Sequence, residues 1–90
     1  MTIRRAQALR EMEIKETPGG KLNTFSIKFI KKNGEIVFLP KAISTGLKFN
    51  MKSTRYRGVA GVDDQGEFIT HIYPVHIDNI IEFNNNNVKL

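Results

Sequence analysis

One stretch decides the fold of this chain, residues 25–39, which reads Phe25-Ser26-Ile27-Lys28-Phe29-Ile30-Lys31-Lys32-Asn33-Gly34-Glu35-Ile36-Val37-Phe38-Leu39. Apolar and polar side chains alternate through its first six residues, as they do in a half-buried β-strand. Asn-Gly between two β-rich runs is a strong hairpin signal, because a type I′ turn needs positive φ at both central residues. We therefore predict a hairpin of residues 25–30 and 36–39, which ends at Pro40.

A two-residue turn at Asn33-Gly34 also predicts the register of this hairpin. Ile30 would lie opposite Val37, and Phe29 opposite Phe38. One face would then belong to the core and hold Phe25, Ile27, Phe29 and Phe38. The other face would hold Ile30, Val37 and Leu39, which is more apolar than an ordinary solvent-facing side. Either a neighbouring segment covers these three residues, or they form a protein-contact surface.

The segments on both sides of the hairpin are short and separated by turn signals. We expect a helix or a loose arm over residues 1–10, with Thr2 as its cap and an apolar stripe of Ile3, Ala6 and Leu9. Short strands are expected at Met12–Glu16, Arg55–Val62, Glu67–Tyr73, Ile80–Phe83 and Val88–Leu90. Residues 41–53 have no clean period and are predicted as a long irregular connection with an optional strand over 47–51. A 3₁₀ turn is expected within 75–79, and a polar turn of four asparagines at 84–87.

This pattern predicts one all-β domain over residues 1–90, with the helix or arm at 1–10 and the β-structure at 11–90. Six or seven short strands at such spacing are typical of a small, partly open barrel of the SH3-like or OB-like kind. The pattern does not choose between these two barrels. The predicted core consists of Ile14, Phe25, Ile27, Phe29, Phe38, Val59, Ile69, Ile72, Ile80 and Phe83.

Length and composition exclude several classes of protein. The chain has 90 residues and no cysteine, which excludes a disulfide scaffold, a thiol nucleophile and cysteine-based zinc sites. No apolar run approaches the roughly 18–20 residues of a membrane span, so no membrane partner is expected. The first residues, Met1 to Arg5, are not followed by the apolar stretch of a secretory signal, and the expected location is cytoplasmic.

Charge is distributed unevenly along the chain. Residues 1–57 hold 13 basic and 4 acidic residues, a balance of +9, whereas residues 58–90 hold one base and 5 acids, a balance of −4. The stretch from Lys41 to Arg57 contains five cations and no acid. Such asymmetry indicates a polyanionic partner or a self-complementary neighbour. The alternative is a solvated face that keeps a small protein soluble.

The basic stretch is the best candidate for a binding site. Its cations would neutralise phosphates, and Tyr56 could stack on an unpaired base. We therefore predict a non-enzymatic module that binds nucleic acid, either DNA or RNA. The predicted contact residues are Lys41, Lys48, Lys52, Arg55, Tyr56 and Arg57.

A structural role is the alternative. The basic half of one copy could dock on the acidic half of the next, as in a subunit of a multi-copy complex of the phage or mobile-element type. In this case Ile30, Val37 and Leu39 would form part of the contact between copies, or with another protein partner.

Enzymatic chemistry has little support in the sequence. No serine lies in a nucleophile elbow, no glycine-rich phosphate loop is present, and no small-molecule substrate or cofactor is indicated. His71, His76 and Asp78 lie close together in sequence, but their spacing is not a known metal-ligand signature. We therefore expect no enzyme and no metal site, with a metal protein built on these three residues as a third, weaker hypothesis.

Overall fold

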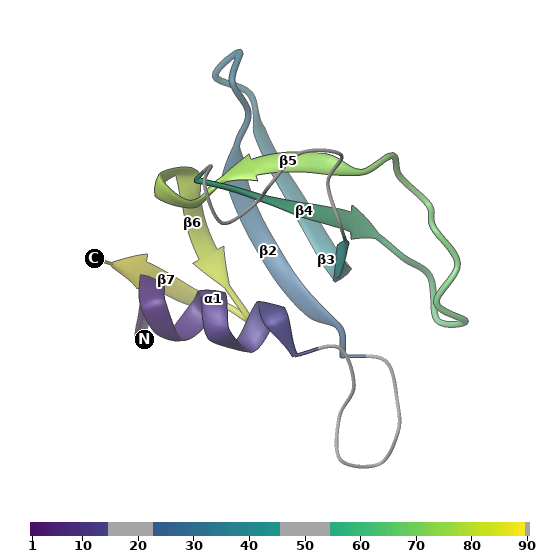
Figure 1. Cartoon of the computed structure of the whole chain (residues 1–90), viewed down its shortest axis with the longest axis horizontal. Coiled ribbons are helices and arrows are strands. Elements are labelled where there is room, and N and C mark those ends of the chain that lie inside the picture. The colour runs from purple at the N-terminus through teal and green to yellow at the C-terminus, as the bar shows by residue number, and fades with distance from the viewer. Residues whose placement is uncertain (15–22, 46–54, 90) are drawn as a thin grey trace.

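A computed structural model describes residues 1–14, 23–45 and 55–89 (Figure 1). Its elements are β1 (Thr2–Arg4), α1 (Arg5–Glu13), β2 (Phe25–Ile30), β3 (Ile36–Thr45), β4 (Tyr56–Gly61), β5 (Tyr73–His76), the 3₁₀ turn η1 (Ile77–Asn79), β6 (Ile80–Phe83) and β7 (Asn86–Lys89). The strands form one mixed sheet in the order β1-β7-β6-β2-β3-β4-β5. The prediction of a mostly β fold with a short N-terminal helix is confirmed. The outermost strands β1 and β5 do not pair with each other, so the described sheet is not closed into a barrel.

The N-terminal segment differs from the prediction. Residues 2–4 form strand β1, which runs parallel to β7, and the helix starts at Arg5. The helix includes Met12 and ends at Glu13, so the prediction that a strand begins at Met12 is wrong. Thr2 therefore does not cap the helix, and Arg4 stands at the N-cap without a side-chain hydrogen bond. Ala8 and Met12, one helical turn apart, are the buried residues of α1.

The hairpin forms where it was predicted, but its register is shifted by one residue. The amide of Gly34 donates to the carbonyl of Lys31 at 2.9 Å, and the amide of Lys31 donates to the carbonyl of Glu35 at 2.7 Å. Gly34 has φ +91°, whereas Asn33 keeps a negative φ. This is a three-residue loop with a bulge glycine, not the expected two-residue type I′ turn.

The longer loop reverses which side of β3 faces the core. Ile30 pairs with Ile36, and Ile27 pairs with Leu39. Leu39 is therefore buried, at 6% exposure, while Phe38 is 51% exposed. The prediction that Phe38 belongs to the core is wrong, because a one-residue change of register moves every side chain to the other face.

Strand β3 continues through Pro40 instead of ending there. The register against β2 shifts between Phe25 and Ile27, so Pro40 lies at an irregularity of the ladder, where a missing N–H is tolerated. Beyond this point β3 pairs with β4, from Ala42 opposite Gly61 to Thr45 opposite Gly58. Figure 1 shows β4 and β5 crossing the β2–β3 hairpin.

The return strand after β4 lies later in the chain than expected. Phe68 forms only an isolated bridge with Val62, and the strand itself is β5, with Pro74 inside it. Because β5 is an edge strand, Pro74 can lie opposite Gly58. Ile69 and Ile72 consequently fall outside the core, at 64% and 40% exposure.

The last segments follow the prediction more closely. The 3₁₀ turn η1 and strand β6 lie where they were expected. Asn84 and Asn85 adopt positive φ values of 49° and 66°, which makes the tight turn into β7. Strand β7 already begins at Asn86, two residues earlier than predicted.

The core lies between the inner face of the sheet and α1. Its largest fully buried side chains are Phe29, Phe83, Met12, Ile27, Val59 and Val75. The predicted core residues Phe25, Ile27, Phe29, Val59, Ile80 and Phe83 are confirmed. The prediction that Ile14 belongs to the core is wrong, since this residue follows the helix and is 51% exposed. Within the described segments, no helix has the length and apolar character needed to cross a membrane.

Candidate nucleic-acid interface

The described cations of the predicted basic stretch, Lys41, Arg55 and Arg57, each pair with a different acid. Lys48 and Lys52 lie outside the described residues. Lys41 pairs with Asp64, with 3.2 Å between Nζ and Oδ1. Arg57 lies 3.7 Å from Oε1 of Glu13 and donates to the carbonyl of Tyr56 at 3.0 Å. Its side chain is only 19% exposed, so Arg57 mainly ties β4 to the end of α1.

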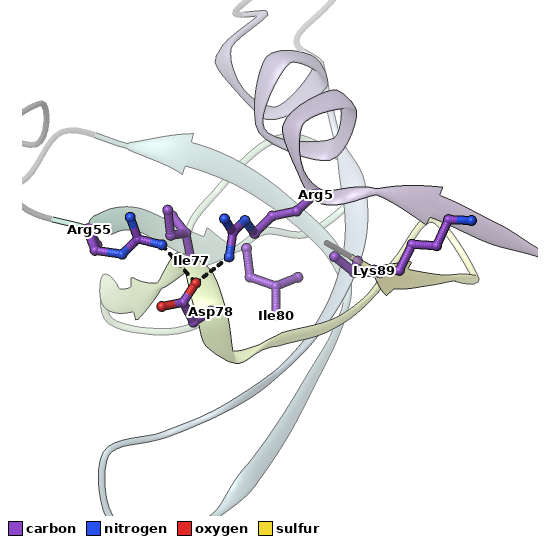
Figure 2. A pocket seen from close by; sticks show the side chains of 7 residues that line it. Arg5, Arg55, Ile77, Asp78, Ile80 and Lys89 are labelled. Atoms are coloured by element: carbon purple, nitrogen blue, oxygen red, sulfur yellow. Dashed lines mark hydrogen bonds and ion pairs between the residues drawn. The ribbon is translucent and has the colours of Figure 1, made fainter.

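Arg55 belongs to a different arrangement, in which two arginines meet one carboxylate (Figure 2). Nη2 of Arg55 donates to Oδ1 of Asp78 at 2.9 Å. Nη1 of Arg5 binds the same oxygen. Arg5 is the first residue of α1, Arg55 immediately precedes β4, and Asp78 is the middle residue of η1. The fold thus brings together three charged side chains from separate parts of the chain.

These side chains line a cavity of about 570 Å³, which we call the cationic pocket. Its other lining residues are Ile77, Ile80, Val88 and Lys89. Figure 2 shows the Lys89 side chain extending from β7 beyond Ile80, with its ammonium group directed away from Asp78. The pocket therefore has an apolar wall, a pair of guanidinium groups and a further cation at its margin.

Electrostatics keep Asp78 ionised. The hydrogen bond from Arg55 is the main reason that the pKa of Asp78 lies below its ordinary value. The positive charges of Arg55 and Arg5 add to this shift, as does His76 when its ring is protonated, while partial desolvation opposes it. The lining of the cationic pocket contains three cations, Arg5, Arg55 and Lys89, and one carboxylate, Asp78, which gives a formal charge of +2. Asp78 thus orients the two arginines without cancelling their charge.

The guanidinium groups retain capacity for an anion. A guanidinium has five N–H donors in a planar fork, which matches the geometry of phosphate and carboxylate. The contacts with Asp78 engage one terminal nitrogen of Arg5 and one of Arg55. An anion that enters the pocket can accept from the remaining nitrogens.

Sequence reasoning found Arg55 but missed Arg5, Asp78 and Lys89 as parts of one site. Arg5 is one of three arginines among the first ten residues and had no predicted role, and Asp78 was grouped with the histidines. The parallel pairing of β1 with β7 places Arg4 opposite Lys89 and brings both chain ends to this pocket. Pairing between segments so distant in sequence leaves no local signal.

A second cavity, of about 320 Å³, also includes a residue of η1, and we call it the aromatic pocket. It is lined by Ile30, Lys32, Tyr56, Pro74, His76 and Asn79. The rings of Tyr56 and His76 meet edge to face, with centroids 5.1 Å apart. Nδ1 of His76 accepts a hydrogen bond from the backbone amide of Asp78 at 3.1 Å, which fixes the imidazole at the start of η1.

The two histidines point into different environments. His71 packs on Tyr73, with ring centroids 4.1 Å apart, whereas His76 packs on Tyr56. Across residues 1–14, 23–45 and 55–89, no three His, Cys, Asp or Glu side chains are grouped as metal ligands. The structure therefore offers no geometry for the hypothesis that His71, His76 and Asp78 hold a metal.

The three predicted protein-contact residues do not share one exposed face. Leu39 is a core residue, and Val37 packs partly buried against the core, so neither belongs to an exposed contact face. Ile30 remains on the outer face, at 36% exposure. With the observed register, its exposed apolar neighbours are Ile36 at 60% and Phe38 at 51%.

Much of the charge asymmetry of the sequence is balanced by ion pairs within the chain. Acids of the second half pair with cations of the first half: Asp78 with Arg5 and Arg55, Asp64 with Lys41, and Glu82 with Lys28 at 2.8 Å. Opposite charges that are distant in sequence thus become neighbours in the fold. This arrangement removes part of the reason to expect the acidic half of another copy as the partner.

Comparison with known proteins adds no relative. The chain matches no family model, no curated protein and no solved structure.

Proposed function

We propose that this chain is a non-enzymatic nucleic-acid-binding β module that receives a backbone phosphate in the cationic pocket. The observation that supports this proposal is the convergence of Arg5 and Arg55 on Asp78 in a concave site. Oriented guanidinium groups recognise phosphate well, because several N–H donors meet one anion in a fixed geometry. Lys89 makes no ion pair within the described residues and can add a phosphate contact at the margin.

The remainder of the basic stretch fits the same role. Lys48 and Lys52 follow the end of β3 and precede Arg55 in the chain, so they stay candidates for contacts with neighbouring phosphates. Lys41 and Arg57 contribute less to this proposal, since each is held by an acid of the same chain.

The order of the strands supports an SH3-like arrangement more than an OB-like one. Strands β2, β3, β4 and β5 form a meander, and β6 then returns beside β2 after the single turn η1. An OB-fold is a Greek-key barrel, which this meander does not match. We infer that the β2–β6 portion is an SH3-like module, to which α1, β1 and β7 are added.

Fluorescence anisotropy with a labelled single-stranded oligonucleotide of about 12 nucleotides tests the function. The double variant Arg5→Gln/Arg55→Gln should weaken binding at least tenfold near 50 mM salt. The slope of the logarithm of affinity against the logarithm of salt concentration should fall by about 2, the loss of about two phosphate contacts. The matched control Arg10→Gln/Lys28→Gln removes the same net charge at residues outside the proposed contact surface and should weaken binding much less. An equal loss in both variants, or wild-type affinity that is insensitive to salt, would contradict the proposal.

Assembly is the second candidate, and the exposed apolar side chains Ile30, Ile36 and Phe38 are the observation that favours it. They lie on one face of the hairpin and would suit contact with a second copy. Light scattering over a range of concentrations would detect self-association. Assembly through this face predicts that Ile36→Ser/Phe38→Ser restores the monomer while nucleic-acid binding is unchanged.

A further inference from the structure

The cationic pocket and the aromatic pocket are adjacent, since both are built on η1 and on the residues that enter β4. Asp78 lines the first, whereas His76, the N-cap of η1, and Asn79, its last residue, line the second. Arg55 and Tyr56 are consecutive residues that divide between the two pockets in the same way. Nδ1 of His76 lies 3.6 Å from Oδ2 of Asp78, so a residue that lines one pocket contacts a residue that lines the other.

We propose that the aromatic pocket takes one unpaired base of a single-stranded nucleic acid whose backbone phosphate occupies the cationic pocket. This inference rests on the proposed function and specifies the strandedness of its ligand. A base and the phosphate next to it are covalently joined, so a binding site for a nucleotide unit needs adjacent aromatic and cationic surfaces. The described structure provides this combination at η1.

The lining of the aromatic pocket suits a flat, partly polar ring. Tyr56 and His76 supply π-surfaces, while Ile30 and Pro74 supply apolar walls. The side-chain amide of Asn79 contains both a donor and an acceptor for the edge of a base. The cavity of about 320 Å³ lies at the lower end of the roughly 300–1,000 Å³ range of small-ligand sites.

The charge around the aromatic pocket also fits a nucleic-acid strand. Lys32 projects from the hairpin loop to the margin of the pocket and forms no ion pair with any residue that the structure describes. Lys32 and the cationic pocket thus both place positive charge next to the base site, where the phosphates of a bound strand could contact it.

A concave site of this kind selects an unpaired base. A base within a duplex presents only its edge to a protein, and its faces are covered by its stacked neighbours. Entry into the pocket would require the base to leave the stack, which costs a few kcal/mol in a duplex and little in a single strand. The proposal therefore predicts weaker binding of duplex than of single strand at equal salt.

Anisotropy with three labelled probes tests this inference: a single-stranded oligonucleotide of about 12 nucleotides, its duplex, and an abasic strand with the same number of phosphates. The wild-type chain should bind the single strand several-fold more tightly than the abasic strand or the duplex. Tyr56→Leu should weaken single-strand binding about tenfold, the loss of one stacking contact, and leave binding of the abasic strand unchanged. Tyr56→Phe keeps the ring and should retain wild-type affinity.

The outcomes separate this inference from the proposed function. If the wild type binds all three probes equally, with a steep salt dependence, the phosphate site stands and the base site is overturned. If Tyr56→Leu weakens the single strand and the abasic strand alike, the residue acts through the fold and the base site is again overturned. Loss of binding to all three probes in Arg5→Gln/Arg55→Gln is the result expected of the phosphate site.

Discussion

Arg55 and Asp78 are joined by a hydrogen bond of 2.9 Å between Nη2 and Oδ1, although 23 residues separate them in the sequence. This contact ties the start of β4 to η1, the turn that leads from β5 into β6. The same carboxylate oxygen receives Arg5 from the beginning of α1. Asp78 therefore binds both arginines, and the pKa of its carboxyl depends on each of them.

Replacement of Arg55 should raise the pKa of Asp78 toward its ordinary value. The Arg55 hydrogen bond is the largest cause of the lowered pKa, and the charge of Arg5 is a smaller one. We expect Arg55→Gln to raise the titration midpoint of the Asp78 carboxyl more than Arg5→Gln does. NMR titration of the side-chain carboxyl carbon measures both. Unchanged midpoints would show that the arginines do not hold this carboxylate in solution.

The pH dependence of stability should follow from the same shift. A carboxyl whose pKa is lower in the folded state stabilises the fold at pH values above its unfolded pKa, and this stabilisation disappears as the pH falls through the folded pKa. The difference in unfolding free energy between the wild type and Asp78→Asn should therefore be constant near neutral pH and decrease in acid. Urea unfolding from pH 7 down to pH 2 measures it. A difference that grows in acid has the wrong sign for this account.

The hairpin register can be tested with two adjacent substitutions. Leu39→Ala should lower the free energy of unfolding by about 2–5 kcal/mol, because Leu39 is buried in the core. Phe38→Ala should cost less than about 1 kcal/mol, because Phe38 is half exposed on the outer face. Chemical denaturation measures both variants. The two-residue turn expected from the sequence predicts the reverse order.

The bulge glycine of the hairpin should resist substitution for backbone reasons alone. A Cβ at Gly34 would meet nothing within 4 Å, yet φ is +91°. Gly34→Ala should therefore cost about 1–2 kcal/mol, the penalty of a left-handed conformation for an L-residue. Gly34→Asn should cost less, since asparagine tolerates positive φ better. Equal thermal stability of the wild type and Gly34→Ala would refute the bulged turn.

The turn between β6 and β7 offers a matched pair of asparagines. Both have positive φ, but among the residues that the structure describes only the Asn84 side chain accepts a backbone hydrogen bond here, of 3.0 Å from the amide of Ser26 to Oδ1. Asn84→Ala should therefore destabilise the protein more than Asn85→Ala, by about 1 kcal/mol. Thermal melting of the two variants gives the comparison. A larger loss for Asn85→Ala would indicate that the contact with Ser26 contributes little.

Local patterns were reliable where a single segment contains its own signal. The alternation in Phe25–Ile30 predicted β2, and the run Ile80–Phe83 predicted β6. The turn residues also marked their turns, since Gly34, Asn84 and Asn85 adopt positive φ. These predictions depend on backbone preferences of a few neighbouring residues, which act before the chain is folded.

Predictions that depended on partners elsewhere in the chain failed more often. Met12 was assigned to a strand because its neighbours alternate, but its side chain is fully buried as part of α1. Pro74 was expected to end a strand, yet it is accommodated because β5 is the outermost strand of the described sheet. A strand assignment made without knowledge of the sheet cannot tell an edge from a centre.

The sequence by itself determined a mostly β chain, the position of its hairpin and an excess of positive charge in its first 57 residues. Only the tertiary structure decided which cations meet and which are neutralised. Lys41 pairs with Asp64 and Arg57 with Glu13, while Arg5 and Arg55 both bind Asp78 in the pocket that Lys89 also lines. The physical reason is that electrostatic interactions depend on distance in space, and the parallel pairing of β1 with β7 joins residues from opposite ends of the chain.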